Sequence, residues 1–181
     1  MAVTRKALAY SKRKVTAYTR KSKKKSKNYV KTVPQQKIVK FNMGNVRAFN
    51  KGEFKHAIRI ITKEAVQIRD LALEAVRQRL QGNLQRKILL PNYYLAVRAY
   101  PHQILRDNKT FSGGTKGERI QTGMKHSFGS TAGRSAPVKK GKAVYEVFFL
   151  NKKDLKFIRE LCKRATPKLP CKCKVVYEEL K

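Results

Sequence analysis

The first forty residues of the chain carry fourteen lysines and arginines and no aspartate or glutamate. A run of like charges of this kind repels itself and cannot bury a core on its own. We therefore expect residues 1–35 to be a basic extended arm that becomes ordered only against an anionic surface. Tyr10, Tyr18 and Tyr29 are interleaved with the cations and offer stacking or packing surfaces. The alternative is a solvated tail without a function.

The whole chain contains 44 lysines and arginines but only 11 aspartates and glutamates, so the formal net charge is +33. A small soluble domain carries a net charge of about 2–8. A surplus this large indicates a protein that lives beside a polyanion. Hydrophobic residues make up 41% of the chain, which excludes a wholly disordered protein. The length suits one domain with an arm, and we expect residues 36–181 to form that domain.

The sequence contains no run of about 18 consecutive apolar residues, and no apolar segment follows its basic N-terminus. We therefore expect neither a membrane span nor a secretory signal. The three cysteines, Cys162, Cys171 and Cys173, are an odd number in one region. Their number argues against a secreted disulfide framework and for a reducing compartment. We expect them to be buried free thiols.

From residue 36 onward the pattern becomes that of a globular domain. Alternating apolar and polar residues, or runs of β-branched and aromatic residues, predict strands. These strands fall at residues 37–41, 54–60, 93–100, 143–150 and 171–177. A turn at 42–45 is expected to end the first of them. In the last, Cys171, Cys173, Val175 and Tyr177 are expected to share one face.

Two segments have the period of an amphipathic helix. We expect the first to be capped by Thr62 and stopped by Gly82. The second is expected to run from a capping box of Asn151 and Asp154 to about Ala165. Several neighbouring strands have no helix between them, which favours an α+β fold. We predict a two-layer sandwich of mainly antiparallel sheet packed with two helices, together with the N-terminal arm and a long basic loop.

The basic loop is predicted from the segment 106–142, which holds seven of the ten glycines, with eight basic residues between Lys109 and Lys142. A loop of this length inside a compact domain is usually functional or disordered. Glycine lets the backbone approach a ligand closely, and lysine or arginine neutralises phosphate. A flexible surface insertion is the plainer alternative.

No constellation of catalytic residues is visible. His56 lies on the apolar face of a predicted strand and is expected to be a core residue, whereas His102 and His126 lie at a strand end and in the basic loop. The segment 113–117 lacks the full spacing of a phosphate-binding loop. The cysteines have no C-x-x-C spacing and no nearby histidine, so a zinc site is not expected. We predict a nucleic-acid-binding protein that is not an enzyme and has no cofactor and no metal.

DNA-reading signatures and RNA-recognition sheet motifs are both absent. A small body with a basic arm and a glycine-rich loop fits a protein embedded in a folded RNA. Residues 37–45, 100–109 and 119–129, which read KIVKFNMGN, YPHQILRDNK and RIQTGMKHSFG, resemble one family, as does Tyr18-Thr19-Arg20. That family is the universal large-subunit ribosomal protein sixteen, in the archaeal and eukaryotic form once called ten-e. The Asn-Met-Gly-Asn segment at 42–45 and the Tyr-Pro-His segment at 100–102 resemble the archaeal form of the family more than the eukaryotic form.

The resemblance implies an α/β sandwich of antiparallel sheet with two helices that binds large-subunit rRNA near the peptidyl-transferase centre, close to the 5S rRNA. It also implies that the loop at about 106–118 points toward the acceptor end of the A-site tRNA and helps to position aminoacyl-tRNA. The implied partners are large-subunit rRNA, 5S rRNA, A-site tRNA and neighbouring ribosomal proteins, in the cytoplasmic ribosome and without a membrane.

The candidate contact residues follow from the charge pattern and the resemblance together. For rRNA binding they are Tyr18, Arg20, Lys21, Lys23, Lys24, Lys25, His102, Arg106, Arg119, Lys125, His126, Arg134, Lys139 and Lys140. For the loop near the tRNA they are Lys109, Phe111, Gly113, Gly114, Lys116 and Gly117. The main alternative function is a free nucleoid- or chromatin-type protein that condenses DNA. An RNA-modifying enzyme is a third class, for which the sequence offers no cofactor pocket.

Overall fold

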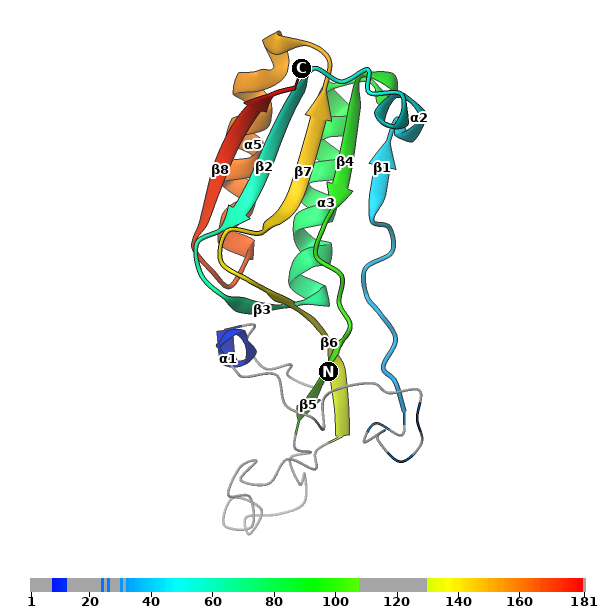
Figure 1. The fold of residues 1–181 in the computed structure, drawn as a ribbon, viewed down its shortest axis with the longest axis vertical. Coiled ribbons are helices and arrows are strands. Elements are labelled where there is room, and N and C mark those ends of the chain that lie inside the picture. The colour runs from blue at the N-terminus through cyan, green and yellow to red at the C-terminus, as the bar shows by residue number, and fades with distance from the viewer. Residues whose placement is uncertain are drawn as a thin grey trace.

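The computed structural model describes residues 8–12, 24, 26, 30, 32–107 and 130–180. Within these residues the chain forms two antiparallel sheets, one of five strands and one of three, with two long helices beside the larger sheet (Figure 1). The prediction of an α+β fold with mainly antiparallel sheet and two helices is confirmed.

The larger sheet has the strand order β1-β4-β7-β2-β8, and all its neighbours are antiparallel. Its strands are β1 (Asn42–Gly44), β4 (Tyr93–Val97), β7 (Ala143–Phe149), β2 (His56–Thr62) and β8 (Cys173–Glu179). Strand β2 pairs over its whole length with β8 on one side, and from His56 to Ile61 with β7 on the other. Apolar, β-branched and aromatic residues fill β4 and β7, which suits strands covered on both faces.

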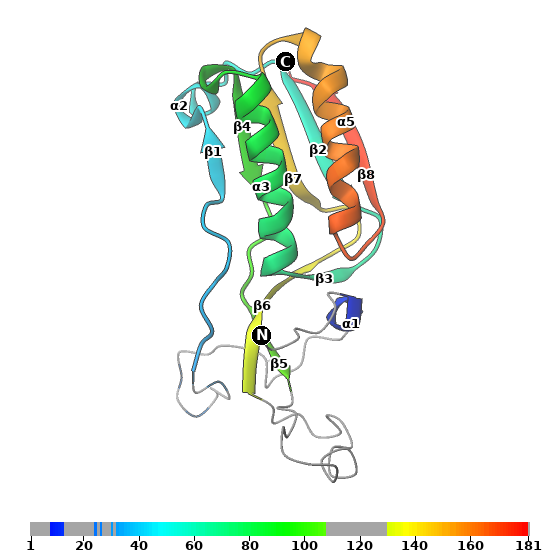
Figure 2. The same ribbon diagram turned by 180° about the vertical axis from the view of Figure 1, so that it is seen from behind.

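Helices α3 (Asp70–Lys87) and α5 (Leu155–Ala165) lie side by side on one face of this sheet (Figure 2). Their apolar stripes and the facing strand residues form the main core, in which Leu73, Leu80 and Ile158 are fully buried. Alternate residues of a strand point to opposite faces, and the short helix α2 (Val46–Asn50) covers part of the other face. There Phe49 of α2 stacks on Tyr94 at 4.3 Å between ring centroids.

The smaller sheet has the order β3-β6-β5, with β3 (Val66–Arg69), β6 (Ser130–Val138) and β5 (Gln103–Asp107). Strands β5 and β6 form a narrow ribbon that projects below the helices and the larger sheet (Figure 1). The prediction that residues 106–142 are all loop is therefore wrong for residues 130–138. Small and polar residues obscured a strand whose partners lie far away in the sequence.

The predicted strand at 37–41 is wrong in position, because the paired residues are Asn42–Gly44. Strand β4 supplies partners only from Tyr94 to Ala96, although the Phe41 carbonyl still accepts a hydrogen bond from the Val97 N–H at 2.8 Å. The expected turn at 42–45 is therefore a strand followed by α2, which Asn45 caps through its side chain.

The first long helix begins seven residues later than predicted and ends at Lys87. Thr62 is the last residue of β2, and its hydroxyl donates to the Lys139 carbonyl at 2.9 Å instead of capping a helix. Gly82 lies inside the helix, with open space around it, and does not stop it. A glycine in a helix interior lowers stability but is tolerated. Helix α5 ends near Ala165 as predicted, but Asn151 makes no side-chain cap and a 3₁₀ turn, Lys152–Asp154, precedes it.

Three further elements complete the description. They are the one-turn helix α1 (Leu8–Ser11) and the 3₁₀ turns Leu90–Asn92 and Thr166–Lys168. The strand at 143–149 and the shared face of the last strand are confirmed, since Cys173, Val175 and Tyr177 pack against the main core.

Gly44 is a position where only glycine fits, and its replacement provides a test of the β1–β4 pairing. Its φ is +92°, and an added Cβ would lie 2.3 Å from the carbonyl oxygen of Tyr93. Gly52 has a φ of +73° with nothing within 4 Å. The left-handed conformation alone costs a side chain about 1–2 kcal/mol, which we expect for Gly52→Ala. For Gly44→Ala we expect at least about twice that loss, measured by urea unfolding in high salt. Equal losses would contradict the close approach.

Candidate nucleic-acid interface

Two of the predicted RNA-contacting arginines lie against protein at the β5–β6 ribbon. Arg106, in β5, is 8% exposed. Arg134, in β6, is half-buried, and its Nε donates to the carbonyl of Pro34 at 2.8 Å while Nη1 lies 3.4 Å from Oε1 of Gln36. Arg134 therefore fastens the end of the predicted arm to the ribbon.

The first part of the predicted arm also touches the domain. Helix α1 contacts β3, and Tyr10 is 2% exposed. The buried guanidinium of Arg69 lies 5.3 Å from the centre of the Tyr10 ring, a cation–π contact. One of the interleaved tyrosines is thus a packing residue. Of the predicted arm contacts Lys24 is exposed, and the others, Tyr18, Arg20, Lys21, Lys23 and Lys25, lie outside the described residues.

The predicted loop contacts also lie outside the described residues. These are Lys109, Phe111, Gly113, Gly114, Lys116, Gly117, Arg119, Lys125 and His126. His102 is exposed just before β5, with Nδ1 3.0 Å from the Tyr100 carbonyl. Tyr100 is itself 54% exposed and rests on Phe41 at 4.9 Å between ring centroids. An exposed tyrosine beside an imidazole offers a nucleic-acid base a surface for stacking.

Lys139 and Lys140 belong to a larger group of lysines where the lower ends of β2, β7 and β8 meet (Figure 1). We call this group the lysine corner. Its members are Lys63, Lys139, Lys140, Lys142, Lys172 and Lys174, and all six are exposed.

Backbone hydrogen bonds hold the three segments of the lysine corner together. The N–H of Thr62 donates to the Lys142 carbonyl at 3.1 Å, and the Gly141 N–H donates back to the Thr62 carbonyl at 2.8 Å. The N–H of Lys63 donates to the Lys172 carbonyl at 2.9 Å. Gly141 has a φ of +81°, which lets the β6–β7 turn fold tightly against the end of β2.

None of the six lysines forms an ion pair with a carboxylate in the part of the chain that the structure describes. Glu64 follows Lys63 in the sequence, but it forms no ion pair with these lysines, and Glu146 is engaged elsewhere, with Arg59 at 3.3 Å and Arg98 at 2.5 Å. Six neighbouring lysines that outnumber the nearby acid repel one another and favour binding to a polyanion. Sequence reasoning missed Lys63, Lys142, Lys172 and Lys174 because the corner joins segments more than thirty residues apart.

The titratable groups of the core fit a structural role. His56 is buried, with Nδ1 3.0 Å from the Tyr177 hydroxyl. Burial raises the pKa of the Cys162 thiol to about 12, so this cysteine is an inert free thiol as predicted. Cys171 and Cys173 are half-buried rather than buried, with their sulfurs 3.6 Å apart. Within the described residues no three histidines, cysteines or carboxylates gather as metal ligands.

No helix in the described ranges is long and apolar enough to cross a membrane. The longest, α3, carries charged residues along most of its length.

Comparison with known proteins gives one consistent result. The family described as ribosomal protein L16p/L10e matches residues 14–176. The chain is 39% identical over 157 residues to the large ribosomal subunit protein uL16 of Staphylothermus marinus, with 86% of each chain covered. It is 36% identical to that of Methanococcus aeolicus over 88% of this chain and 86% of the relative. It is 34% identical to that of Pyrobaculum calidifontis, over 96% of this chain and 93% of the relative.

The lysine corner makes a prediction about salt dependence. Changing Lys63, Lys140, Lys142 and Lys172 together to glutamine is expected to weaken binding to a folded RNA. The slope of log K against log salt should fall by up to about 3, because each lost phosphate contact removes about 0.7–0.9. Filter binding over a salt series measures both quantities.

A matched control removes the same charge from the opposite end of the sheet. Its four exposed lysines are Lys51, Lys55, Lys152 and Lys153. We expect this variant to keep nearly the original slope. Equal slopes in the two variants would contradict a specific role for the lysine corner.

Proposed function

Because the chain belongs to the ribosomal protein L16p/L10e family, we propose that it binds large-subunit rRNA near the peptidyl-transferase centre and helps to position aminoacyl-tRNA in the A site. At the coarser level, the protein is a structural constituent of the large ribosomal subunit and not an enzyme. In the finer proposal, its further partners are 5S rRNA, the A-site tRNA and neighbouring ribosomal proteins. The chemistry of peptide-bond formation stays with the RNA.

The observation that carries the proposal is the narrow ribbon of β5 and β6. Asp107 lies directly opposite Ser130 in the ladder, so the segment between them leaves and re-enters the protein at one point. That point is the end of the ribbon farthest from the helices (Figure 1). A thin projection of this kind enters a crevice in folded RNA that the whole domain cannot enter.

The composition of the segment supports a contact with RNA. Residues 109–117 contain two lysines, one phenylalanine and three glycines, which offers little for a protein core. Lys109 and Lys116 would screen the repulsion between phosphates where two RNAs converge. Phe111 would stack on a base, a contact of about 1–3 kcal/mol. The arm and the lysine corner would hold the domain on the surrounding rRNA.

Deleting residues 109–117 tests the proposal directly. We expect the variant to enter the large subunit nearly as well as the wild type, because the ladder from Gln103 to Asp107 is retained. Accommodation of aminoacyl-tRNA and peptide-bond formation should both slow. Peptidyl transfer on reconstituted subunits measures the effect. Wild-type rates in subunits that contain the deletion would refute the role at the A site.

Truncating the arm gives a second, independent prediction. Neutralising about 6–10 phosphates makes affinity fall by about 10³–10⁵ between 50 and 200 mM salt. Removing residues 1–30 should flatten this dependence, since it deletes eleven of the fourteen cations in residues 1–40 together with Tyr10, Tyr18 and Tyr29. An unchanged salt slope would contradict an RNA-binding arm.

Sedimentation separates the ribosomal proposal from its main alternative. Endogenous protein should travel with large subunits and dissociate only in high salt. Recovery with chromosomal DNA instead would favour a DNA-condensing protein.

A further inference from the structure

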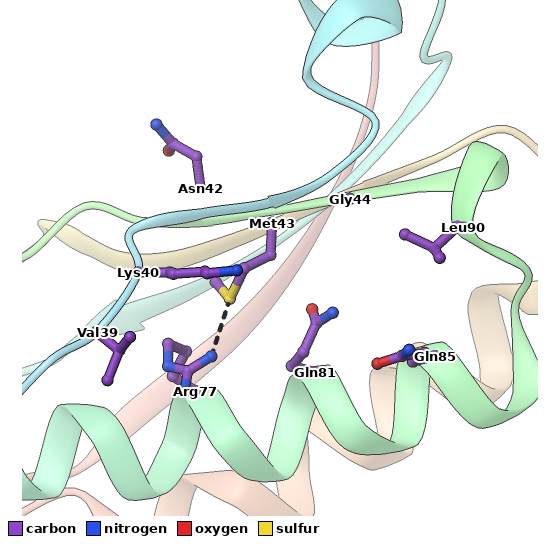
Figure 3. A pocket seen from close by; sticks show the side chains of 9 residues that line it. All are labelled: Val39, Lys40, Asn42, Met43, Gly44, Arg77, Gln81, Gln85 and Leu90. Atoms are coloured by element: carbon purple, nitrogen blue, oxygen red, sulfur yellow. Dashed lines mark hydrogen bonds between the residues drawn. The ribbon is translucent and has the colours of Figure 1, made fainter.

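A cavity of about 510 Å³ lies between the edge strand β1 and helix α3 (Figure 3). This volume falls in the range of small-molecule sites. Its lining combines apolar side chains, among them Val39, Met43 and Leu90, with cationic and carboxamide groups. We call it the β1–α3 groove.

Arg77 forms a rigid part of the wall. Its Nε and Nη2 donate to the carboxylate of Glu74 at 2.7 and 2.5 Å, and its Nη1 lies 3.3 Å from Sδ of Met43. The bidentate pair fixes the plane of the guanidinium and balances its charge. The same contact lowers the pKa of Glu74, so the pair stays ionised at neutral pH. A fixed guanidinium plane is a surface on which RNA bases stack.

Gln81 brings an unmet hydrogen-bond acceptor to the groove. Its Nε2 donates to the Tyr93 hydroxyl at 3.0 Å, but its Oε1 is shielded from water and accepts no hydrogen bond from any described residue. A carboxamide has both donors and an acceptor, and glutamine uses them to read the edge of a base. A small rotation of Gln81 would turn this acceptor toward an N–H in the groove. Gln85, one helical turn later, supplies a second and exposed carboxamide.

The rim of the groove carries charge and apolar surface that the isolated domain does not use. Val39 is 72% exposed and Leu90 is 54% exposed. Lys40 is exposed and makes no ion pair with a carboxylate in the described part of the chain. The arrangement therefore joins a free cation, flat apolar surface, a fixed guanidinium and two carboxamides, which are the groups that single-stranded RNA recognition combines.

We propose that the β1–α3 groove holds one unstacked nucleotide of RNA. The base stacks on the guanidinium of Arg77 with its edge toward Gln81, while Val39 and Leu90 supply apolar surface at the two ends of the groove, and Lys40 meets its phosphate. The inference rests on the proposed function, because it requires RNA around the protein. A strand from another protein, added to the edge of β1, is the competing occupant. It fits less well because β1 has only three residues and would supply few ladder hydrogen bonds.

Nucleoside 5′-monophosphates, with inorganic phosphate as the reference, provide the direct probe. In titrations of ¹⁵N-labelled full-length protein, at least one nucleotide should shift the amide signals of Met43, Gly44 and Gln81, and phosphate alone should not. Gln81→Leu should weaken that binding about tenfold, the loss expected for one base-edge contact. Lys40→Gln should also weaken it. Its matched control, Lys37→Gln, alters an exposed lysine three residues away that does not line the groove and should have no effect.

Formaldehyde crosslinking of purified large subunits tests the occupant in place. A nucleotide attached to Lys40, identified by mass spectrometry, would support the proposal, and a peptide of another protein there would overturn it. Equal responses to nucleotides and phosphate, or equal effects of the two lysine variants, would also overturn it. Failure of the proposed function is distinguishable, because the wild-type protein would then not sediment with large subunits at all.

Discussion

Carboxylates are scarce in this protein, and their placement decides which parts of the chain fold without a partner. The chain has eleven acids and 44 cations, and several of the acids hold the domain together through ion pairs and hydrogen bonds. Glu146, in the middle strand of the larger sheet, joins Arg59 of β2 to Arg98 just beyond β4. Asp70 accepts the N–H of Lys37 at the start of α3, and Glu74 holds Arg77. At the lysine corner six exposed lysines outnumber the nearby Glu64, and this surface favours an outside anion.

The local sequence pattern correctly predicted two kinds of element. These are the elements that contact their sequence neighbours and those whose side chains are strongly buried. The strand at 143–149 and the helix ending at Ala165 belong to this group. The errors arose where a distant partner decided the outcome. Thr62 has the chemistry of a helix cap, but its hydroxyl donates a hydrogen bond to the carbonyl of Lys139, 77 residues away. Likewise, Ser130–Val138 becomes a strand because β3 and β5 pair with it on both sides.

The candidate site divides in the same way. A contiguous run of charge, such as the arm, is visible in the sequence because its residues are adjacent. The lysine corner is assembled by three turns, so only Lys139 and Lys140 could be found beforehand. The β1–α3 groove was not predictable, since it depends on the pairing of Asn42–Gly44 with β4, in place of residues 37–41, and on the fixed plane of Arg77. Arg134 shows what charge alone does not reveal: its guanidinium also binds Pro34 and Gln36 of the same chain.

Asp107 and Ser130 lie opposite each other in the ladder, and this pairing also affects how the protein can evolve. Because the two ends of the intervening segment are already joined, its length is nearly independent of the energetics of the domain. Doubling a flexible loop costs only about 0.6 kcal/mol in closure entropy. Lineages can therefore lengthen, shorten or rewrite the tip while the register of β5 and β6 stays constant. Substitutions at the tip are therefore constrained by the RNA that the tip contacts, and hardly at all by the stability of the fold.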